Sequence, residues 1–427
     1  LGVQVVYRLL FKKASMILLN NMCMLLCIGL IMLTRLNAAR AETQFKIIVI
    51  STLLSFIVPV IIRKVKILKD LTWLYGIAGL LMIGAVLVLA VTSRGAKLSI
   101  QFGGENGFTF QFSEFVKITL VFFMAGMLRE DNSFRKVVIT TVVAALHVLI
   151  LVASTDLGTA LVYFVAYVVV IYLATRKPVY PLLGLGGMAV ACVAAYFLFS
   201  HVRTRVQVWR DPFSNYDAGY QVIQALFGLS SGGWFGTGLF EGSPTSIPLA
   251  TKDATFCAIC EEMGVIFGIC LILLCMSMFL LIVNISMKMN KRFYKLIAMG
   301  LGSEYAIQVF LTIGGITKFI PLTGITLPLV SYGGSSMLCT ILMFSIIQGL
   351  YILREDEGEA LAKRNKQKRK KSKTTAKTGS GPADKTSGNA GRKKPQPTGR
   401  GTGRTDLPEE DDLGRRIEEQ TEKSLRW

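Results

Sequence analysis

The chain has 427 residues, of which 52% are apolar, and its mean hydropathy of +0.51 is too high for an ordinary soluble domain. This composition excludes a soluble enzyme and indicates a polytopic membrane protein. The net charge is +20. Because the basic residues lie mainly in short loops and in a C-terminal tail, we interpret them as topology signals and contacts for anionic membrane lipids. We do not interpret them as a nucleic-acid site.

Apolar windows of about 20 residues predict an all-α polytopic membrane protein with about ten transmembrane helices. The expected spans are residues 15–34, 46–62, 72–92, 112–128, 137–153, 157–174, 179–199, 264–285, 296–316 and 333–353. The segment 200–263, between the seventh and eighth spans, is long and polar. We expect it to form a large extracytoplasmic loop.

The orientation follows from the loops. Those on one side are rich in Lys and Arg, as at Arg63, Lys64 and Arg292, whereas those on the other side carry few basic residues. The positive-inside rule therefore places both termini in the cytoplasm and the loop 200–263 outside.

Residues 354–427 are rich in Lys, Gly, Thr and Pro and nearly free of large apolar side chains. Such a composition cannot bury a core, so we expect a membrane domain over 1–353 and a disordered basic cytoplasmic tail over 354–427. The basic run from Lys363 to Lys373 either holds anionic headgroups or is simply solvated.

The eight cysteines lie mostly in apolar runs, which is typical of small buried side chains. Cys257 and Cys260 form a C-x-x-C pair, but a zinc site needs further ligands and the chain has two histidines, His147 and His201. We interpret the pair as helix packing and predict no metal-ligating cluster.

The segment 321–336, Pro-Leu-Thr-Gly-Ile-Thr-Leu-Pro-Leu-Val-Ser-Tyr-Gly-Gly-Ser-Ser, interrupts two apolar spans. Its prolines and glycines prevent either helix from continuing through it. Irregular backbone beside a membrane persists only where protein or a wet cavity satisfies its polar groups. The segment should therefore line a site.

Ionisable residues in or beside spans are costly and are candidates for function. Glu114 and Lys117 lie three residues apart at the start of the fourth span and can pair on one helix face, as a substrate contact or as a structural ion pair. Asp156 begins the sixth span, where an aspartate is also an ordinary helix cap. Asp253 lies just before the eighth span and, from its position alone, is an ordinary loop residue.

Several of these segments resemble the SEDS (FtsW/RodA/SpoVE) family of peptidoglycan glycosyltransferases. The match is nearly letter for letter over 321–336. The family's Gln-Pro-Ser-Glu-x-x-Lys motif corresponds to 111–117, with Phe112 in place of proline. Asp-Leu-Gly-Thr recurs at 156–159, and the glycine-rich outer loop at 219–238 is similar. The aspartate that precedes the family's Glu-Glu-x-Gly stretch corresponds to Asp253.

The resemblance implies an enzyme that polymerises lipid II, an undecaprenyl-pyrophosphate substrate, into glycan strands at the outer face of the bacterial cytoplasmic membrane. It implies a role in cell division, elongation or sporulation, and a class B penicillin-binding protein as partner. No nucleotide is needed because the pyrophosphate already activates the donor.

The resemblance also implies roles for particular residues. Asp253 is the expected catalytic base, because a carboxylate at a low-dielectric boundary has a raised pKa, although Lys252 beside it opposes that rise. Cations near the leaving pyrophosphate would stabilise the transition state. Five are available on the outer side: Lys117, Arg203, Arg205, Arg210 and Lys252. The expected substrate-binding residues are Glu114, Lys117, Arg203, Arg210, Gln221, Lys252, Ser331 and Ser335. A divalent cation, Mg²⁺ or Mn²⁺, could share this role, but no ligand cluster in the sequence requires one.

Two departures from the family pattern keep other functions open. Leu98 stands where members have an arginine, and Thr251 stands where they often have a histidine. One alternative is a lipid II flippase or another transporter, since broken helices and buried charges also suit transport. The other is a non-catalytic scaffold for a penicillin-binding protein. The clustering of charges at the outer face favours the polymerase.

Overall fold

The computed structural model describes residues 2–89, 91–93, 96–102 and 108–378. The chain divides into two units, residues 1–366 and 367–427. The described part of the second unit is the end of one helix, and every site considered below lies in the first unit.

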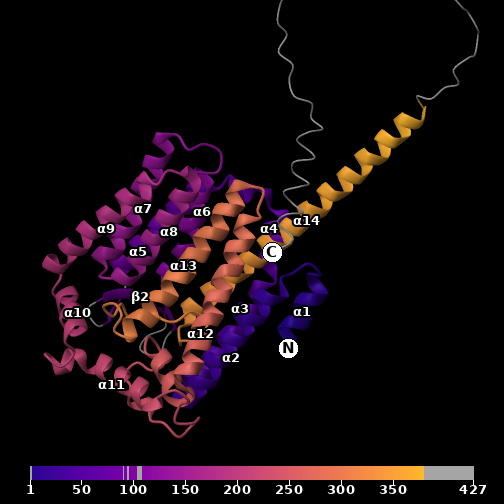
Figure 1. Ribbon diagram of the computed structural model, residues 1–427. Coiled ribbons are helices and arrows are strands. Elements are labelled where there is room, and N and C mark those ends of the chain that lie inside the picture. Colours follow the sequence, from indigo (N-terminus) through magenta and orange to yellow (C-terminus); the bar gives the residue numbers. More distant parts are fainter. Residues whose placement is uncertain (1, 90, 94–95, 103–107, 379–427) are drawn as a thin grey trace, which may run out of the picture. The chain divides into compact units, whose positions relative to one another are not determined.

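The protein is predominantly helical, which confirms the predicted fold class (Figure 1). The helices are α1 (Gly2–Leu10), α2 (Met16–Leu36), α3 (Ala38–Ser55), α4 (Ile57–Lys64), α5 (Thr72–Leu89), α6 (Phe112–Met127), α7 (Phe134–Ala153), α8 (Leu157–Thr175), α9 (Val179–Leu198), α10 (Ser200–Arg210), α11 (Tyr216–Gly232), α12 (Thr255–Met287), α13 (Arg292–Ile316) and α14 (Gly334–Thr378), with short 3₁₀ helices at Lys66–Lys69 and Pro244–Ser246.

Each predicted span coincides with a helix, and the second is divided between α3 and α4. Among the described residues, eight helical segments are long and apolar enough to cross a membrane. The protein is therefore a multi-pass membrane protein. The 16-residue α6 and the short apolar stretch Thr72–Val86 of α5 are not among those eight, so a total of ten spans stays a prediction.

The division between α3 and α4 has a local cause. Pro59 has no backbone N–H and its ring collides with the carbonyl four residues earlier, that of Ser55. The freed carbonyl of Ser55 instead accepts a hydrogen bond from the Ser345 hydroxyl on α14. The break in one helix is thus used to attach it to another.

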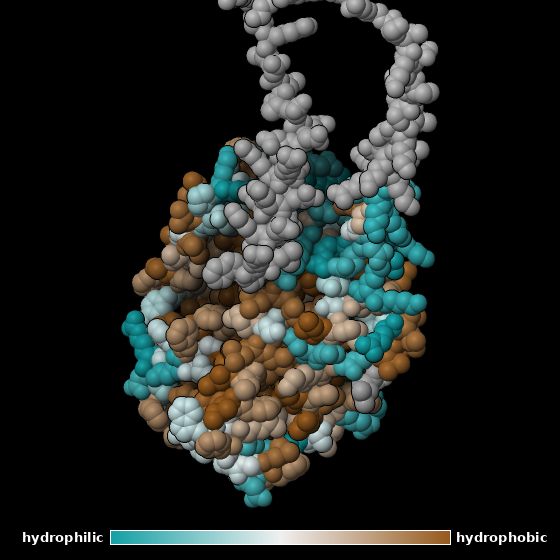
Figure 2. Space-filling model, turned by 45° about the vertical axis from the view of Figure 1, so that its right-hand side comes forward, coloured by the Kyte–Doolittle hydropathy of each residue, from teal (hydrophilic) through white to brown (hydrophobic). Residues whose placement is uncertain are grey.

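The two ends of the helical bundle differ. The end with α10, α11 and the segment 317–333 is called the loop side here, and the end where α14 passes residues 354–359 is called the tail side (Figure 1). α13 packs against α6, α8 and α12 and is largely buried, whereas α9 has no buried residue and packs against α8 and α10. Figure 2 shows apolar side chains over much of the middle of one face, with hydrophilic ones mainly at its margins.

The loop side contains structure that the sequence did not predict. Strands β1 (Val91–Ser93), β2 (Ala96–Phe102) and β3 (Phe108–Phe110) form an antiparallel sheet in the order β1-β2-β3, between α5 and α6. The long loop 200–263 holds α10, α11 and the first turns of α12. That helix kinks at Gly264, whose φ of 85° is left-handed and favours glycine.

The predicted start of the tail at residue 354 differs from the structure, because α14 continues as a helix to Thr378. Ion pairs from Lys13, Arg63 and Lys291 to α14 extend its contacts beyond the apolar span. Residues 379–427 of the predicted tail lie outside the described residues.

Candidate active site

The segment between α13 and α14 is held by protein groups, as the sequence predicted. The Ser331 hydroxyl donates to Thr255 Oγ1 at 3.1 Å and accepts from the Leu327 N–H at 3.1 Å. Gln44 Nε2 donates to the Ser331 carbonyl at 3.2 Å. The Tyr332 N–H donates to the Thr251 carbonyl at 2.7 Å. These contacts fix the segment against α3 and against the turn that leads into α12.

Asp253 lies in that turn, and its side chain is buried with the residue only 5% exposed. A Cβ atom added at Gly324 would lie 4.0 Å from Asp253 Oδ2, so the segment and the carboxylate face each other. Gly324 has a φ of 78°, a left-handed conformation that glycine adopts without strain. The neighbouring Lys252 is exposed.

Arg40, on α3, reaches the same turn and was not predicted. Its Nη1 donates to Thr251 Oγ1 at 2.7 Å, and its guanidinium lies 5.6 Å from the centre of the Tyr332 ring. Thr251 is the residue that the resemblance matches to a histidine. The turn beside Asp253 therefore has a cation next to it that comes from a distant part of the sequence.

Arg205, on α10, is one of the outer-side cations that the resemblance offered for the leaving pyrophosphate. Its Nη1 donates to the Thr323 carbonyl at 3.3 Å. Burial lowers the pKa of the Arg205 guanidinium, whereas the Asp156 and Asp253 carboxylates raise it. Arg205 is thus within electrostatic reach of the predicted base.

The predicted substrate contacts Arg203 and Arg210 are both exposed on α10, and Arg203 Nη2 donates to the Phe197 carbonyl at 3.2 Å. Arg205 instead shares a helix face with Val208 and Trp209, three and four residues further on. That spacing was available in the sequence and could have distinguished Arg205 from its neighbours.

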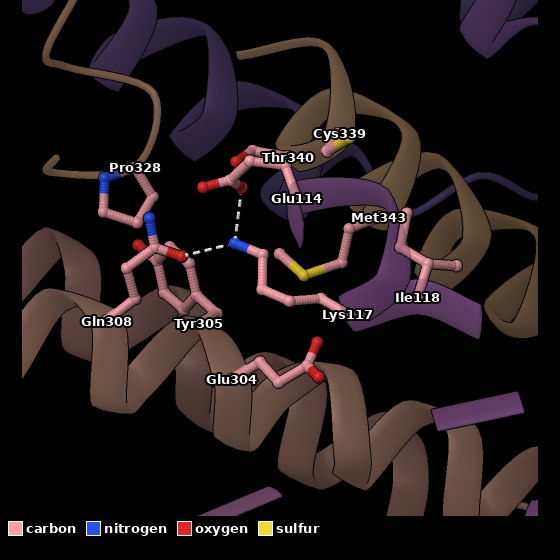
Figure 3. Close-up of a pocket in the computed structure, with 10 residues that line it drawn as sticks. All are labelled: Glu114, Lys117, Ile118, Glu304, Tyr305, Gln308, Pro328, Cys339, Thr340 and Met343. Carbon is pink, nitrogen blue, oxygen red and sulfur yellow. Dashed lines mark hydrogen bonds and ion pairs between the residues drawn. The ribbon is translucent and has the colours of Figure 1, made fainter. Parts of the chain in front are cut away.

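Glu114 and Lys117 pair as predicted, with Lys117 Nζ 2.6 Å from Glu114 Oε2 (Figure 3). Lys117 Nζ also donates to Gln308 Oε1 at 2.8 Å, and Gln308 Nε2 donates to the Thr326 carbonyl at 3.1 Å. The ion pair is therefore connected through α13 to the segment that faces Asp253.

A cavity of about 10 Å³ lies beside this ion pair, room for about one water molecule. Glu304 lines it from α13 and is 2% exposed, and neither of its carboxylate oxygens has a hydrogen-bond partner among the described residues (Figure 3). Sequence reasoning missed Glu304, although an ionisable residue inside a predicted span is itself a signal.

The remaining predicted residues have separate positions. Ser335 Oγ accepts from the Gln111 N–H at 3.3 Å, which ties α14 to the start of α6. Gln221 is half-buried on α11. Asp156 caps α8 by accepting from the Thr159 N–H at 3.1 Å, and burial raises the pKa of its carboxyl. No three His, Cys, Asp or Glu side chains gather as a metal site in the described ranges.

A protein-family model named FTSW_RODA_SPOVE, and described as cell cycle protein, matches residues 16–355. The chain is 37% identical over 295 residues to the peptidoglycan glycosyltransferase RodA of Mycobacterium tuberculosis (strain CDC 1551 / Oshkosh), covering 64% of this chain and 62% of that protein. It is 31% identical over 255 residues to stage V sporulation protein E of Bacillus subtilis (strain 168), covering 57% of this chain and 69% of that protein. The chain thus spans less than two thirds of the length of its RodA relatives.

Two solved structures share the fold. One, described as the structural coordination of polymerization and crosslinking by a peptidoglycan synthase complex, has a TM-score of 0.70 at 22% identity, over 80% of this chain and 98% of that one. The rod shape determining protein RodA of Thermus thermophilus has a TM-score of 0.61 at 20% identity, over 79% of this chain and 96% of that one.

Proposed function

Because the chain belongs to the FtsW/RodA/SpoVE family of cell cycle proteins, whose model matches residues 16–355, we propose that it polymerises lipid II into peptidoglycan glycan strands. Relatives from several bacteria are named peptidoglycan glycosyltransferases. The observation that carries the proposal is the buried Asp253 carboxylate, which faces Gly324 of the segment 317–333 and has Arg205 within electrostatic reach.

In the proposed reaction, a sugar hydroxyl of the acceptor attacks the anomeric carbon of the donor. A carbon–oxygen bond forms there as the bond to the lipid pyrophosphate breaks, and the pyrophosphate leaves with the electron pair. Asp253 takes the proton of the attacking hydroxyl as general base. Arg205 stabilises the negative charge that develops on the leaving group.

The Glu114–Lys117 pair is proposed as a positioning element. Through Gln308 and the Thr326 carbonyl, it holds the backbone of the segment 317–333. Direct substrate contacts by Glu114, Lys117, Gln221, Lys252, Ser331 and Ser335 stay predictions. Among them, Ser331 and Ser335 already bind protein groups.

The protein alone would supply only some of the ligands that a divalent cation needs. Since the described residues contain no cluster of three metal ligands, Mg²⁺ or Mn²⁺ would need oxygens from the substrate phosphates as well as a carboxylate. When bound, it would neutralise charge on the leaving pyrophosphate.

The loop side is proposed to face outward, with both termini in the cytoplasm, because the basic loops at Arg63 and Arg292 then obey the positive-inside rule. A class B penicillin-binding protein is the proposed partner, supported by the likeness in fold to a peptidoglycan synthase complex. The role could be in division, elongation or sporulation.

Transport of lipid II is a second candidate, and the buried Glu114, Lys117 and Glu304 favour it, because charges inside a membrane often mark a translocation route. A scaffold role rests on the substitutions at Leu98 and Thr251.

The test is glycan synthesis from purified lipid II by the full chain, with and without a class B penicillin-binding protein. Asp253→Asn should lower the polymerisation rate by at least about 10²-fold, the usual contribution of general-base catalysis. Asp217→Asn, an exposed loop-side aspartate on α11, is the matched control and should polymerise normally. Equal polymer from Asp253→Asn and wild type would refute Asp253 as the base, and no polymer from wild type with its partner bound would favour transport or scaffolding.

A further inference from the structure

A second and larger cavity, of about 60 Å³, lies on the loop side between α10, α11 and the end of α13. We call it the loop-side pocket. Its volume is several times the roughly 10–15 Å³ that one water molecule needs. The residues that define its chemistry are Thr204, Arg205, Val208, Trp209, Lys318 and Leu322.

The lining of the loop-side pocket is amphipathic. Arg205 and Lys318 provide two cations, while Val208, Val222 and Leu322 provide apolar surface. Such a lining complements a molecule with an anionic group and an apolar chain, because the cations bind the anion and the aliphatic side chains exclude water from the chain.

Lys318 is held where it is by backbone rather than by an ion pair. Its φ of 62° is left-handed, which is unusual for a residue with a side chain. Its carbonyl accepts a hydrogen bond from Trp209 Nε1 at 3.2 Å. None of the ion pairs among the described residues includes Lys318, so its ammonium is available to an external anion.

The pocket adjoins the segment that faces the proposed catalytic base. Leu322 lines the pocket, and Gly324, two residues later, faces Asp253. Arg205 lines the pocket, binds the Thr323 carbonyl and is influenced by the charge of Asp253. A group bound in the pocket would therefore lie against the segment that separates it from the base.

We propose that the loop-side pocket binds the phosphate end of a lipid-linked pyrophosphate, with Lys318 and Arg205 as its cationic ligands. This inference rests on the proposed function for the identity of the lipid. An ordinary anionic phospholipid shares the chemistry of one phosphate and one apolar chain region. The pyrophosphate is favoured because the pocket carries two cations and adjoins the segment whose Gly324 faces Asp253.

The test measures binding rather than turnover. The full chain, purified in uncharged detergent, is titrated with undecaprenyl pyrophosphate, with undecaprenol and with phosphatidylglycerol. Lys318→Gln should weaken pyrophosphate binding about tenfold, the effect of losing one charge-assisted hydrogen bond of about 1.4 kcal/mol. Lys318→Arg should restore it. Lys46→Gln, which removes an exposed loop-side cation paired with Glu42, is the charge-matched control and should bind as wild type does.

Several results would decide the matter. Equal pyrophosphate binding by Lys318→Gln and wild type would overturn the proposal, as would a Lys318→Gln defect limited to phosphatidylglycerol. Asp253→Asn should bind the pyrophosphate normally yet fail to polymerise, which separates the role of the pocket from that of the base.

The same measurements distinguish failure of the pocket from failure of the proposed function. If wild type polymerises but Lys318→Gln loses no affinity, the pocket assignment alone fails. If wild type neither polymerises nor binds the pyrophosphate, the proposed function fails with it. Thermal unfolding of each variant confirms that it is folded.

Discussion

Two groups of ion pairs in this protein have similar distances and very different surroundings. Lys117 lies 2.6 Å from Glu114 near the cavity beside α13, and their side chains are 9% and 7% exposed. On the tail side, Asp356 lies 2.8 Å from Lys13 and 2.7 Å from Arg63, with side chains 30–39% exposed. The distance between charges therefore says little about the energy of a pair, because solvent decides how much of the Coulomb interaction remains.

The largest expected effect comes from breaking the buried pair on one side. Lys117→Met leaves the Glu114 carboxylate buried without its cation, and Glu304 lines the same cavity. Removing one partner of a buried pair typically costs about 3–5 kcal/mol. Chemical unfolding in detergent micelles should show a loss of this size.

A double variant distinguishes the cost of an unpaired charge from that of lost packing. Glu114→Gln together with Lys117→Met removes both charges, so it should recover much of the stability lost in Lys117→Met. If the double variant is as unstable as the single one, packing rather than charge accounts for the loss. The buried pair would then differ from the tail-side pairs in its packing and not in the strength of its charge interaction.

A smaller, pH-dependent effect on the free energy of unfolding is expected from Asp156. Burial raises the pKa of its carboxyl above the unfolded value, so the folded state binds more protons than the unfolded state. The stability this contributes is fully present below the unfolded pKa and is lost as pH rises through the folded pKa. Glu114 strengthens the shift, while Lys117 and the hydrogen bonds with Thr159 oppose it.

Asp156→Asn should therefore remove the loss of stability that wild type shows as the pH rises through the folded pKa of Asp156. The amide oxygen of asparagine can still accept from the Thr159 N–H, so the cap on α8 is retained. Thermal unfolding of wild type and variant from acid to neutral pH provides the measurement. Parallel curves for the two proteins would show that Asp156 is not the group responsible.

The sequence predicted the helices well because each span needs its own apolar stretch. It placed the start of the eighth span at 264, whereas α12 begins at Thr255. Glu261 and Glu262 lower the hydropathy there, yet both are buried, since the Ser243 N–H donates to Glu261 at 2.8 Å and Arg35 pairs with Glu262 at 2.8 Å. The hydropathy of the local sequence cannot show that residues elsewhere in the chain will pair with these two carboxylates.

The candidate site was predicted where its residues are close in sequence and missed where they are not. Glu114 and Lys117 are one helical turn apart, so their pairing followed from helix geometry. Arg40 reaches Thr251 across 211 positions of sequence, a contact that exists only after α3 and the turn before α12 come together. The contact of Arg40 with the turn beside Asp253 could not be found without the tertiary fold.

The smallest effect on stability is expected from the exposed ion pairs on the tail side. Asp356→Asn removes a carboxylate that pairs with both Lys13 and Arg63, but exposed pairs contribute at most about 1 kcal/mol. Lys13 also keeps a second partner, Glu359, at 2.8 Å. Unfolding measured at about 0.1 M and 1 M salt, where the screening length falls from roughly 10 Å to 3 Å, should show wild type approaching the variant. If Asp356→Asn instead lost several kcal/mol of stability and salt did not alter the loss, the tail-side pairs would be shielded from solvent. They would then stabilise the fold as much as the buried Glu114–Lys117 pair does.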